Sequence, residues 1–189
     1  MMPTRFRTPR PFSVSEYYAM VPAGILRPDD RVELIRGQIL NLRPISPRHA
    51  HRVTRLGHLL FLRVDLMATI SIHNPVRLDT YSEPVPDLKL LVRKEIYAER
   101  HPHPDEVLLV IEVADTTLDF DRRIKIPLYA EAGIREYWIV NLAGESLEVY
   151  RQPGPDGYAE TMTLQRGDEV EILALPAAGM FSVEEILGP

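Results

Sequence analysis

The stretch VLLVIEVADTTLDFDRRIKIPLYAEAG, residues 107–133, decides the fold. Its first seven residues form an almost continuous apolar run, which predicts a strand that is covered on both faces, as in the middle of a sheet. Residues 118–132 then predict a helix that ends at Gly133, and Pro127 should kink or split this helix. A buried strand followed directly by a helix is typical of an α/β protein.

The residues before this unit predict two helices and a hairpin. Ser13 and Glu16 have the spacing of a capping box, which indicates a short helix to about residue 20. Two alternating runs within 31–42 meet at Arg36-Gly37 and favour a hairpin, because glycine accepts a positive φ angle. Apolar residues at helical spacing predict the first long helix over 49–67.

The remaining segments predict strands joined by irregular connections. Prolines interrupt 79–86 and 94–106, so both segments are expected to be irregular. Strands are expected at 70–78, 88–92, 136–140, 147–150 and 158–164, with a last short helix at 183–187. The order of elements predicts a mixed sheet flanked by helices, with an N-terminal hairpin and additional C-terminal strands. We expect a single domain over residues 1–189, with 1–11 as an irregular arm.

Length and composition exclude several protein classes. The 189 residues are 45% hydrophobic and 26% charged, which is ordinary for a globular protein and excludes a disordered chain. Cysteine is absent, so disulfides and thiol chemistry are excluded. No apolar run approaches the ~20 residues of a membrane span, and the N-terminus lacks the apolar core of a signal peptide. We therefore expect a cytoplasmic protein that does not enter a membrane.

Charge is distributed unevenly along the chain. Residues 1–63 hold 11 arginines and four acidic residues, a formal charge of +7, whereas residues 64–189 sum to −12. The basic N-terminal part favours contact with a polyanion such as nucleic acid. An ordinary solvated surface is the alternative, because nucleic-acid-binding domains are usually more basic than this chain.

Glu112 is the most unusual residue, because it lies within the most apolar strand of the chain. Acidic side chains are rarely buried unless they are paired, since an isolated buried carboxylate costs several kcal/mol or takes up a proton. This carboxylate should therefore face a cation, a metal or an open strand end. Alternatively, the strand ends at Ile111 and Glu112 lies at its exposed tip.

Four further residues are candidates, each with an ordinary explanation. Asp87 follows Pro86 and opens a strand, although Pro-Asp is also a common loop dipeptide. Lys125 is one of only three lysines, but it could pair with Asp121 four residues earlier on a helix surface. Two more candidates are Glu33, which could be an exposed strand residue, and His49, which could be structural or solvated.

The combination of these residues is more informative than any one of them. Mg²⁺ prefers oxygen ligands, usually one or two carboxylates with water and phosphate oxygens. Asp87 at the start of one strand and Glu112 near the end of the next can converge when the two strands pair. A lysine from the following helix, Lys125, could then orient a water molecule. Such an arrangement is typical of metal-assisted phosphodiester hydrolysis.

These residues carry a resemblance to the PD-(D/E)xK nuclease superfamily. More narrowly, the chain resembles the Uma family of putative restriction endonucleases. Matching segments run in family order from residue 29 to residue 142: DDRVELIRGQIL, SPRHA, NPVRL, SEPVPDL, VLLVIEVADTT, DRRIK and PLYAEAGIREYWIVNL. The resemblance implies a restriction-endonuclease-like α/β fold.

The resemblance also implies roles for individual residues. Asp87 and Glu112 would bind the metal, together with Glu33 and the backbone carbonyl of Val113, and Lys125 would be the catalytic lysine. The superfamily usually has this lysine two residues after the glutamate, where this chain has Ala114. The residues expected beside the site are His49, Asp121 and His73, of which His73 stands where the family would have glutamine.

We therefore predict a DNA endonuclease that uses Mg²⁺, with Mn²⁺ as an alternative metal. A homodimer is expected, because two symmetric sites can cut both strands of a duplex. Two other functions stay open. The chain could be a non-catalytic nucleic-acid-binding or regulatory member of the same fold, or a nuclease that acts on RNA, since a fold does not fix a substrate.

Overall fold

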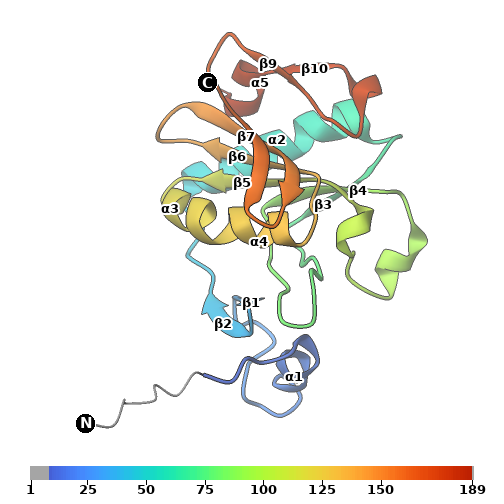
Figure 1. The fold of residues 1–189 in the computed structure, drawn as a ribbon, viewed down its shortest axis with the longest axis vertical. Helices are drawn as coiled ribbons and strands as arrows, with labels where there is room; N and C mark the ends of the chain where they lie inside the picture. Colours follow the sequence, from blue (N-terminus) through green and yellow to red (C-terminus); the bar gives the residue numbers. More distant parts are fainter. Residues whose placement is uncertain (1–8, 189) are drawn as a thin grey trace.

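A six-stranded mixed sheet forms the centre of the computed structural model, which describes residues 9–188 (Figure 1). Its strand order is β3-β4-β5-β6-β7-β8, and only β5 and β6 run parallel. The strands are β3 (Thr69–Ile72), β4 (Leu88–Leu91), β5 (Val107–Ala114), β6 (Glu136–Asn141), β7 (Ser146–Gly154) and β8 (Gly157–Leu164). The mixed sheet flanked by helices is the fold class predicted from the sequence.

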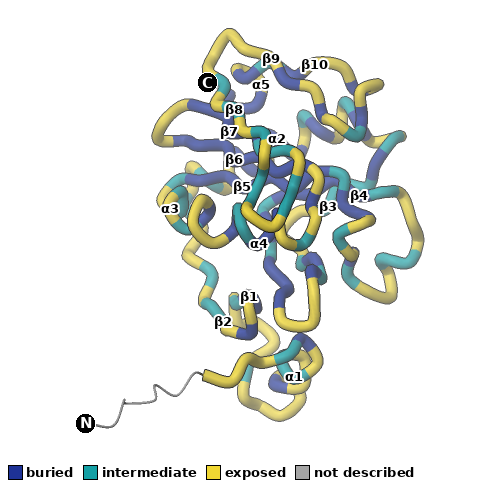
Figure 2. Tube along the Cα trace, viewed as in Figure 1, coloured by how far each residue is buried: buried dark blue, intermediate teal, exposed yellow. Residues whose placement is uncertain are grey.

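Helices cover both faces of this sheet, as the apolar run at β5 predicts. Helix α2 (Pro47–Val64) packs on one face, where Leu56 contributes to the same apolar cluster as Ile111 of β5. Helix α4 (Ile126–Glu131) packs on the other face, where Leu128 joins the cluster that contains Val110 of β5. Alternate residues of β5 thus enter two separate cores, and Figure 2 shows the central strands as buried.

The helix predicted over 118–132 is split, as Pro127 requires. It consists of α3 (Leu118–Phe120), a π-helical segment over Asp121–Lys125, and α4, in whose first turn Pro127 lies. Proline has no N–H group to donate to the preceding turn, so the regular α-helical hydrogen bonding is interrupted and the segment before α4 is π-helical. The π-helical segment buries the side chains of Asp121 and Lys125. Gly133 ends the helix with φ at 78°.

An N-terminal lobe, residues 9–41, lies at one end of the sheet domain (Figure 1). It contains α1 (Val14–Ala19), with the predicted Ser13–Glu16 capping box, and the predicted hairpin of β1 (Val32–Ile35) and β2 (Gln38–Asn41). The loop 79–86 joins this lobe to the sheet domain, because Gly37 donates to Tyr81 O over 2.7 Å and Glu83 donates to Leu34 O over 2.7 Å. Residues 1–8 of the predicted arm lie outside the described residues.

The C-terminal residues form a small unit over α2 that the sequence only partly predicts. Strands β9 (Glu169–Glu171) and β10 (Met180–Ser182) pair antiparallel, and α5 (Val183–Leu187) follows with its predicted Ser182–Glu185 capping box. Phe181 and Ile186 extend the apolar cluster that α2 occupies. Within the described residues, no helix combines the length and apolar character needed to cross a membrane.

Several predicted boundaries are wrong. The strand predicted over 70–78 ends at Ile72, because His73 adopts a φ angle of 51°, which a strand does not accommodate. The connection 94–106 contains two short 3₁₀ helices, Glu95–Ala98 and Pro104–Glu106. The strand predicted over 147–150 extends to Gly154, because β7 and β8 pair as one long hairpin.

We predict that Gly37→Ala destabilises the protein more than Gly24→Ala. Both glycines have positive φ, at 74° and 70°, so either substitution forces alanine into a left-handed conformation at about 1–2 kcal/mol. A Cβ at Gly37 would also lie 2.9 Å from the backbone nitrogen of Phe12, whereas a Cβ at Gly24 meets nothing within 4 Å. Overpacking should add about 1–3 kcal/mol at Gly37 alone.

Urea unfolding followed by far-ultraviolet circular dichroism measures both free energies. Equal losses in the two variants would contradict a close contact between the hairpin turn and residues 11–12.

Candidate active site

Asp87 and Glu112 meet where strand β4 begins beside strand β5. Leu88 pairs with Ile111 in the antiparallel register, which places Asp87 next to Glu112. The backbone N–H of Asp87 donates to Glu112 Oε2 over 3.2 Å, and the N–H of Val113 donates to Asp87 Oδ2 over 2.8 Å. β5 continues to Ala114, so Glu112 is a buried residue of the strand and not its exposed tip.

Lys125 joins the N-terminal lobe to this strand end. Its Nζ donates to Glu33 Oε2 over 2.9 Å and to Glu112 Oε1 over 3.1 Å. All three side chains are at most 8% exposed. Glu33 also accepts from the N–H of Val85 over 3.0 Å, which fixes it beside the 79–86 loop. The structure thus brings together three charged groups from β1, β5 and the π-helical segment.

Carboxylates outnumber cations in this cluster. Burial raises the pKa of Glu112 well above its ordinary value, against the effect of Lys125, and the charges of Asp87 and Asp121 raise it further. Burial opposes the charge on Lys125, but Glu112 and Glu33 outweigh it and hold the lysine pKa well above its usual value. One ammonium group therefore does not neutralise the surrounding acids.

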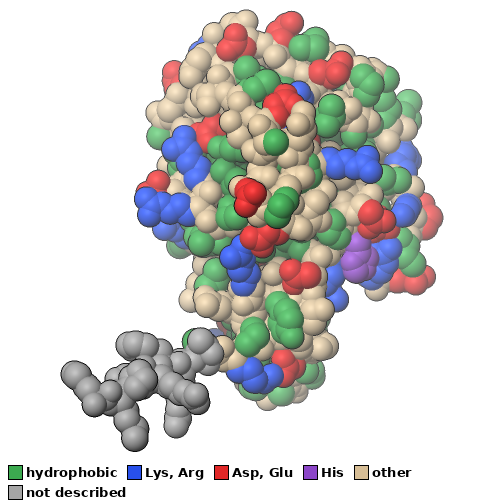
Figure 3. Space-filling model, in the orientation of Figure 1, with side chains coloured by type: hydrophobic (Ala, Val, Ile, Leu, Met, Phe, Trp, Pro, Cys, Tyr) green, Lys and Arg blue, Asp and Glu red, His purple; other side chains and the backbone are tan. Residues whose placement is uncertain are grey.

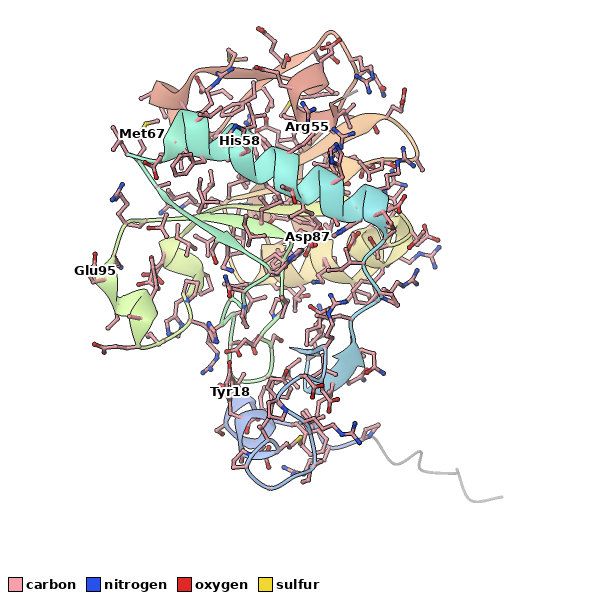
Figure 4. The ribbon with its side chains drawn as sticks, turned by 180° about the vertical axis from the view of Figure 1, so that it is seen from behind. Tyr18, Arg55, His58, Met67, Asp87 and Glu95 are labelled. Atoms are coloured by element: carbon pink, nitrogen blue, oxygen red, sulfur yellow. The ribbon has the colours of Figure 1, made fainter. Side chains whose placement is uncertain are left out.

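Asp87 lies between two histidines on its other side. His49 Nε2 is 3.0 Å from Asp87 Oδ2, and His73 Nε2 is 3.3 Å from Asp87 Oδ1. Burial alone would raise the pKa of Asp87, but hydrogen bonds with both histidines hold it well below its ordinary value. The hydrogen bond with Asp87 correspondingly raises the pKa of His49. In Figure 4, Asp87 lies close to helix α2, which carries His49.

Other predicted residues are placed differently from what the sequence suggested. Asp121 is buried and accepts a hydrogen bond from Thr117 Oγ1 over 2.7 Å, so the predicted surface pair of Asp121 with Lys125 is wrong. The side chain of Lys125 is likewise buried, at only 4% exposed. Val113 contributes its N–H to Asp87, and a ligand role for its carbonyl stays a prediction.

Sequence reasoning missed two residues of this region. Tyr129 donates its hydroxyl to Glu112 Oε1 over 3.2 Å, and its position four residues after Lys125 on one helix was the available signal. Lys89 is completely buried and donates to Asn74 O over 2.5 Å. Burial lowers the pKa of Lys89 to about 7. A lysine within the apolar strand LKLL was the signal here.

The donor set fits a divalent cation. Asp87 and Glu112 supply carboxylates at one strand end, and burial first, then the neighbouring carboxylates, raise the pKa values of Glu112 and Asp121. Two imidazole nitrogens lie within reach of Asp87. A bound dication would relieve the repulsion among these carboxyl groups, as hard oxygen ligands do for Mg²⁺ in proteins.

Comparisons with known proteins identify similar chains. The model of the family Uma2, described as "Putative restriction endonuclease", matches residues 14–184. A solved structure, described as a putative nuclease belonging to DUF820 from Anabaena variabilis ATCC 29413, superposes with a TM-score of 0.70. It is 14% identical and covers 94% of this chain and 98% of its own, so the likeness shows a shared fold. No curated protein matches the chain.

We predict that Asp121→Asn stabilises the protein at pH 7.5. Burial raises the pKa of Asp121 from 3.8 to about 6, so ionisation of this group opposes folding. Its stabilising contribution is complete below about pH 4 and is lost as the pH rises towards 6. Asparagine mimics the protonated form, so the variant should gain about 1–3 kcal/mol at pH 7.5 and almost nothing at pH 4.

Chemical denaturation in EDTA at both pH values measures the free energy of unfolding. Asp119→Asn is the matched control, because Asp119 is exposed. A loss of stability in Asp121→Asn at pH 7.5 would show that the charged carboxylate supports the fold.

Proposed function

Because the chain belongs to the Uma2 family of putative restriction endonucleases, we propose that it is a divalent-metal-dependent endonuclease that hydrolyses DNA phosphodiester bonds. One observation carries this proposal beyond the family. The buried Lys125 ammonium lies between the carboxylates of Glu33 and Glu112, and Asp87 adjoins Glu112. This places a fixed positive charge beside a pair of potential metal ligands.

Asp87 and Glu112 are the proposed metal ligands, with Glu33 and the Val113 carbonyl as further candidates. A bound divalent cation would supply a polarised water and stabilise charge on the phosphate. Glu112 uses one oxygen for Lys125 and Tyr129 and directs the other towards Asp87. Hydrogen bonds with Tyr129 and Lys125 therefore fix the orientation of this carboxylate before any metal binds.

Lys125 is the proposed group that orients the attacking water. An ammonium group has three N–H donors, and two of them donate to Glu33 and Glu112. The third N–H is the proposed donor to a water or a phosphate oxygen. Because the ammonium is held by two buried carboxylates, it needs little reorganisation when negative charge develops on the phosphate.

Arginines along helix α2 support a nucleic-acid substrate. The helix begins beside Asp87 and carries Arg48, Arg52 and Arg55, and a pocket of about 170 Å³ is lined by Arg48, Arg52 and Arg166. Burial lowers the pKa of Arg52, and the neighbouring guanidinium charges lower it further. Glu145 also lines this pocket, and phosphate oxygens would be further anionic partners for the arginines. The face in Figure 3, by contrast, has acidic and basic side chains interspersed.

The proposed assembly is a cytoplasmic homodimer. A single active site cuts one strand in each binding event, so two sites related by a twofold axis would cut both strands of a duplex. The runner-up functions are cleavage of RNA and a non-catalytic nucleic-acid-binding or regulatory role. The same buried cluster would serve an RNA nuclease, since a fold does not fix its substrate.

We predict that the protein nicks supercoiled plasmid with Mg²⁺ or Mn²⁺ and not with EDTA. Lys125→Met should lower this activity by about 100-fold or more, because the variant lacks the charge that stabilises the transition state. Lys94→Met is the matched control, since Lys94 is partly exposed and pairs with Glu106 instead. Lys125→Met leaves the buried Glu33 and Glu112 without their cation, so its melting temperature should be lower than that of the wild type. Circular dichroism identifies a temperature at which both variants are folded, and the activities are compared there.

A substrate panel decides between the functions. Cleavage of RNA alone would favour the RNA nuclease, and binding of DNA without cleavage under all metals would favour the non-catalytic function. Equal activity in Lys125→Met and the wild type would reject the catalytic role of this lysine.

A further inference from the structure

Two histidines and one aspartate converge beside the buried lysine cluster. His49 comes from the first turn of α2, His73 follows β3, and Asp87 precedes β4. Each offers one ligand atom, and the three atoms all lie within 4.8 Å of one another. First-row metals bind such ligands at about 2.0–2.2 Å, so small side-chain shifts would bring all three atoms onto one cation.

The backbone holds this arrangement in place. Ser46 Oγ accepts from the N–H of His49 over 3.1 Å, which fixes the first turn of α2. His73 adopts a φ angle of 51° and donates its N–H to Asp87 O over 3.0 Å. A positive φ is unfavourable for histidine, so the contacts around it impose this conformation. The two imidazole rings are stacked, with centroids 6.2 Å apart.

The nitrogen donors restrict the choice of cation. Mg²⁺ takes oxygen ligands almost exclusively, whereas imidazole suits later first-row metals such as Fe²⁺, Co²⁺, Ni²⁺ and Zn²⁺. We propose that His49, His73 and Asp87 bind a first-row transition-metal dication in preference to Mg²⁺. This inference deepens the proposed function, because it names the cation that the same site would bind. Metal binding can be measured whether or not the protein cleaves nucleic acid.

Exposure and charge favour entry of such an ion. The His73 side chain is 39% exposed and those of His49 and Asp87 are 15% exposed, so solvent reaches the group and water can complete the coordination. The buried carboxylate of Glu112 adjoins Asp87 and adds negative charge behind it. Lys125 lies on the far side of Glu112 and binds that carboxylate, not Asp87. The three ligands therefore face the open side of the cluster.

The experiment compares metals on the full chain after treatment with EDTA. Isothermal titration should give a dissociation constant for Co²⁺ at least about 10-fold lower than that for Mg²⁺. The visible absorption of bound Co²⁺ should differ from that of Co²⁺ in water, because nitrogen ligands replace some of the water ligands. His73→Gln should weaken Co²⁺ binding by about 10-fold or more while changing Mg²⁺ binding by less than about 3-fold, because a lost ligand typically has an effect of this size.

His58→Gln is the matched control, because His58 is an exposed histidine of α2 away from the cluster (Figure 4). It should bind both metals like the wild type. His73 is itself partly exposed, so its replacement should leave the fold intact, and circular dichroism checks this.

The outcomes separate this inference from the nuclease proposal. A chain that binds Co²⁺ through His73 but cleaves no nucleic acid supports the metal site and overturns the proposed function. A chain that cleaves DNA with Mg²⁺ and shows the same metal affinities in His73→Gln and the wild type overturns the metal site. Equal affinity for Mg²⁺ and Co²⁺ in the wild type also overturns it.

Discussion

The ammonium group of Lys125 is the charge around which the site is organised. A buried lysine needs partners, because transfer of its charge out of water costs several kcal/mol. Glu33 and Glu112 provide them, at 2.9 and 3.1 Å, from two strands that belong to different parts of the molecule. Removal of any one of the three would leave an uncompensated buried charge. The lobe, the sheet and the helix after β5 are therefore held in register by one set of hydrogen bonds.

The local structure around this lysine follows from sequence features that act over a few residues. Pro127 cannot continue an α-helix, and the turn before it is π-helical. Lys125 is at the end of that turn and is turned towards the sheet. β5 passes through the middle of the sheet, so Glu112 cannot reach solvent and must take a partner from the covering helix. The π-helical turn and the buried strand are thus joined by the salt bridge between Lys125 and Glu112.

The sequence predicted the elements whose signals are local. Both capping boxes, the hairpin at Gly37, the buried strand and the split helix are found in the structure. Glu112 was recognised as buried because a charge interrupts an apolar run. The sequence did not predict the positive φ angle of His73, which ends the strand at Ile72. It also missed the β9–β10 pairing, since three-residue strands have too short a pattern.

Glu33 and Lys125 are 92 residues apart in the chain. Formation of this contact requires closure of a long loop, which has an entropic cost. A chain whose sheet has formed but whose N-terminal hairpin has not yet docked lacks one of its two carboxylate partners for Lys125. Partly folded chains in a cell would thus carry the sheet without its assembled charge cluster.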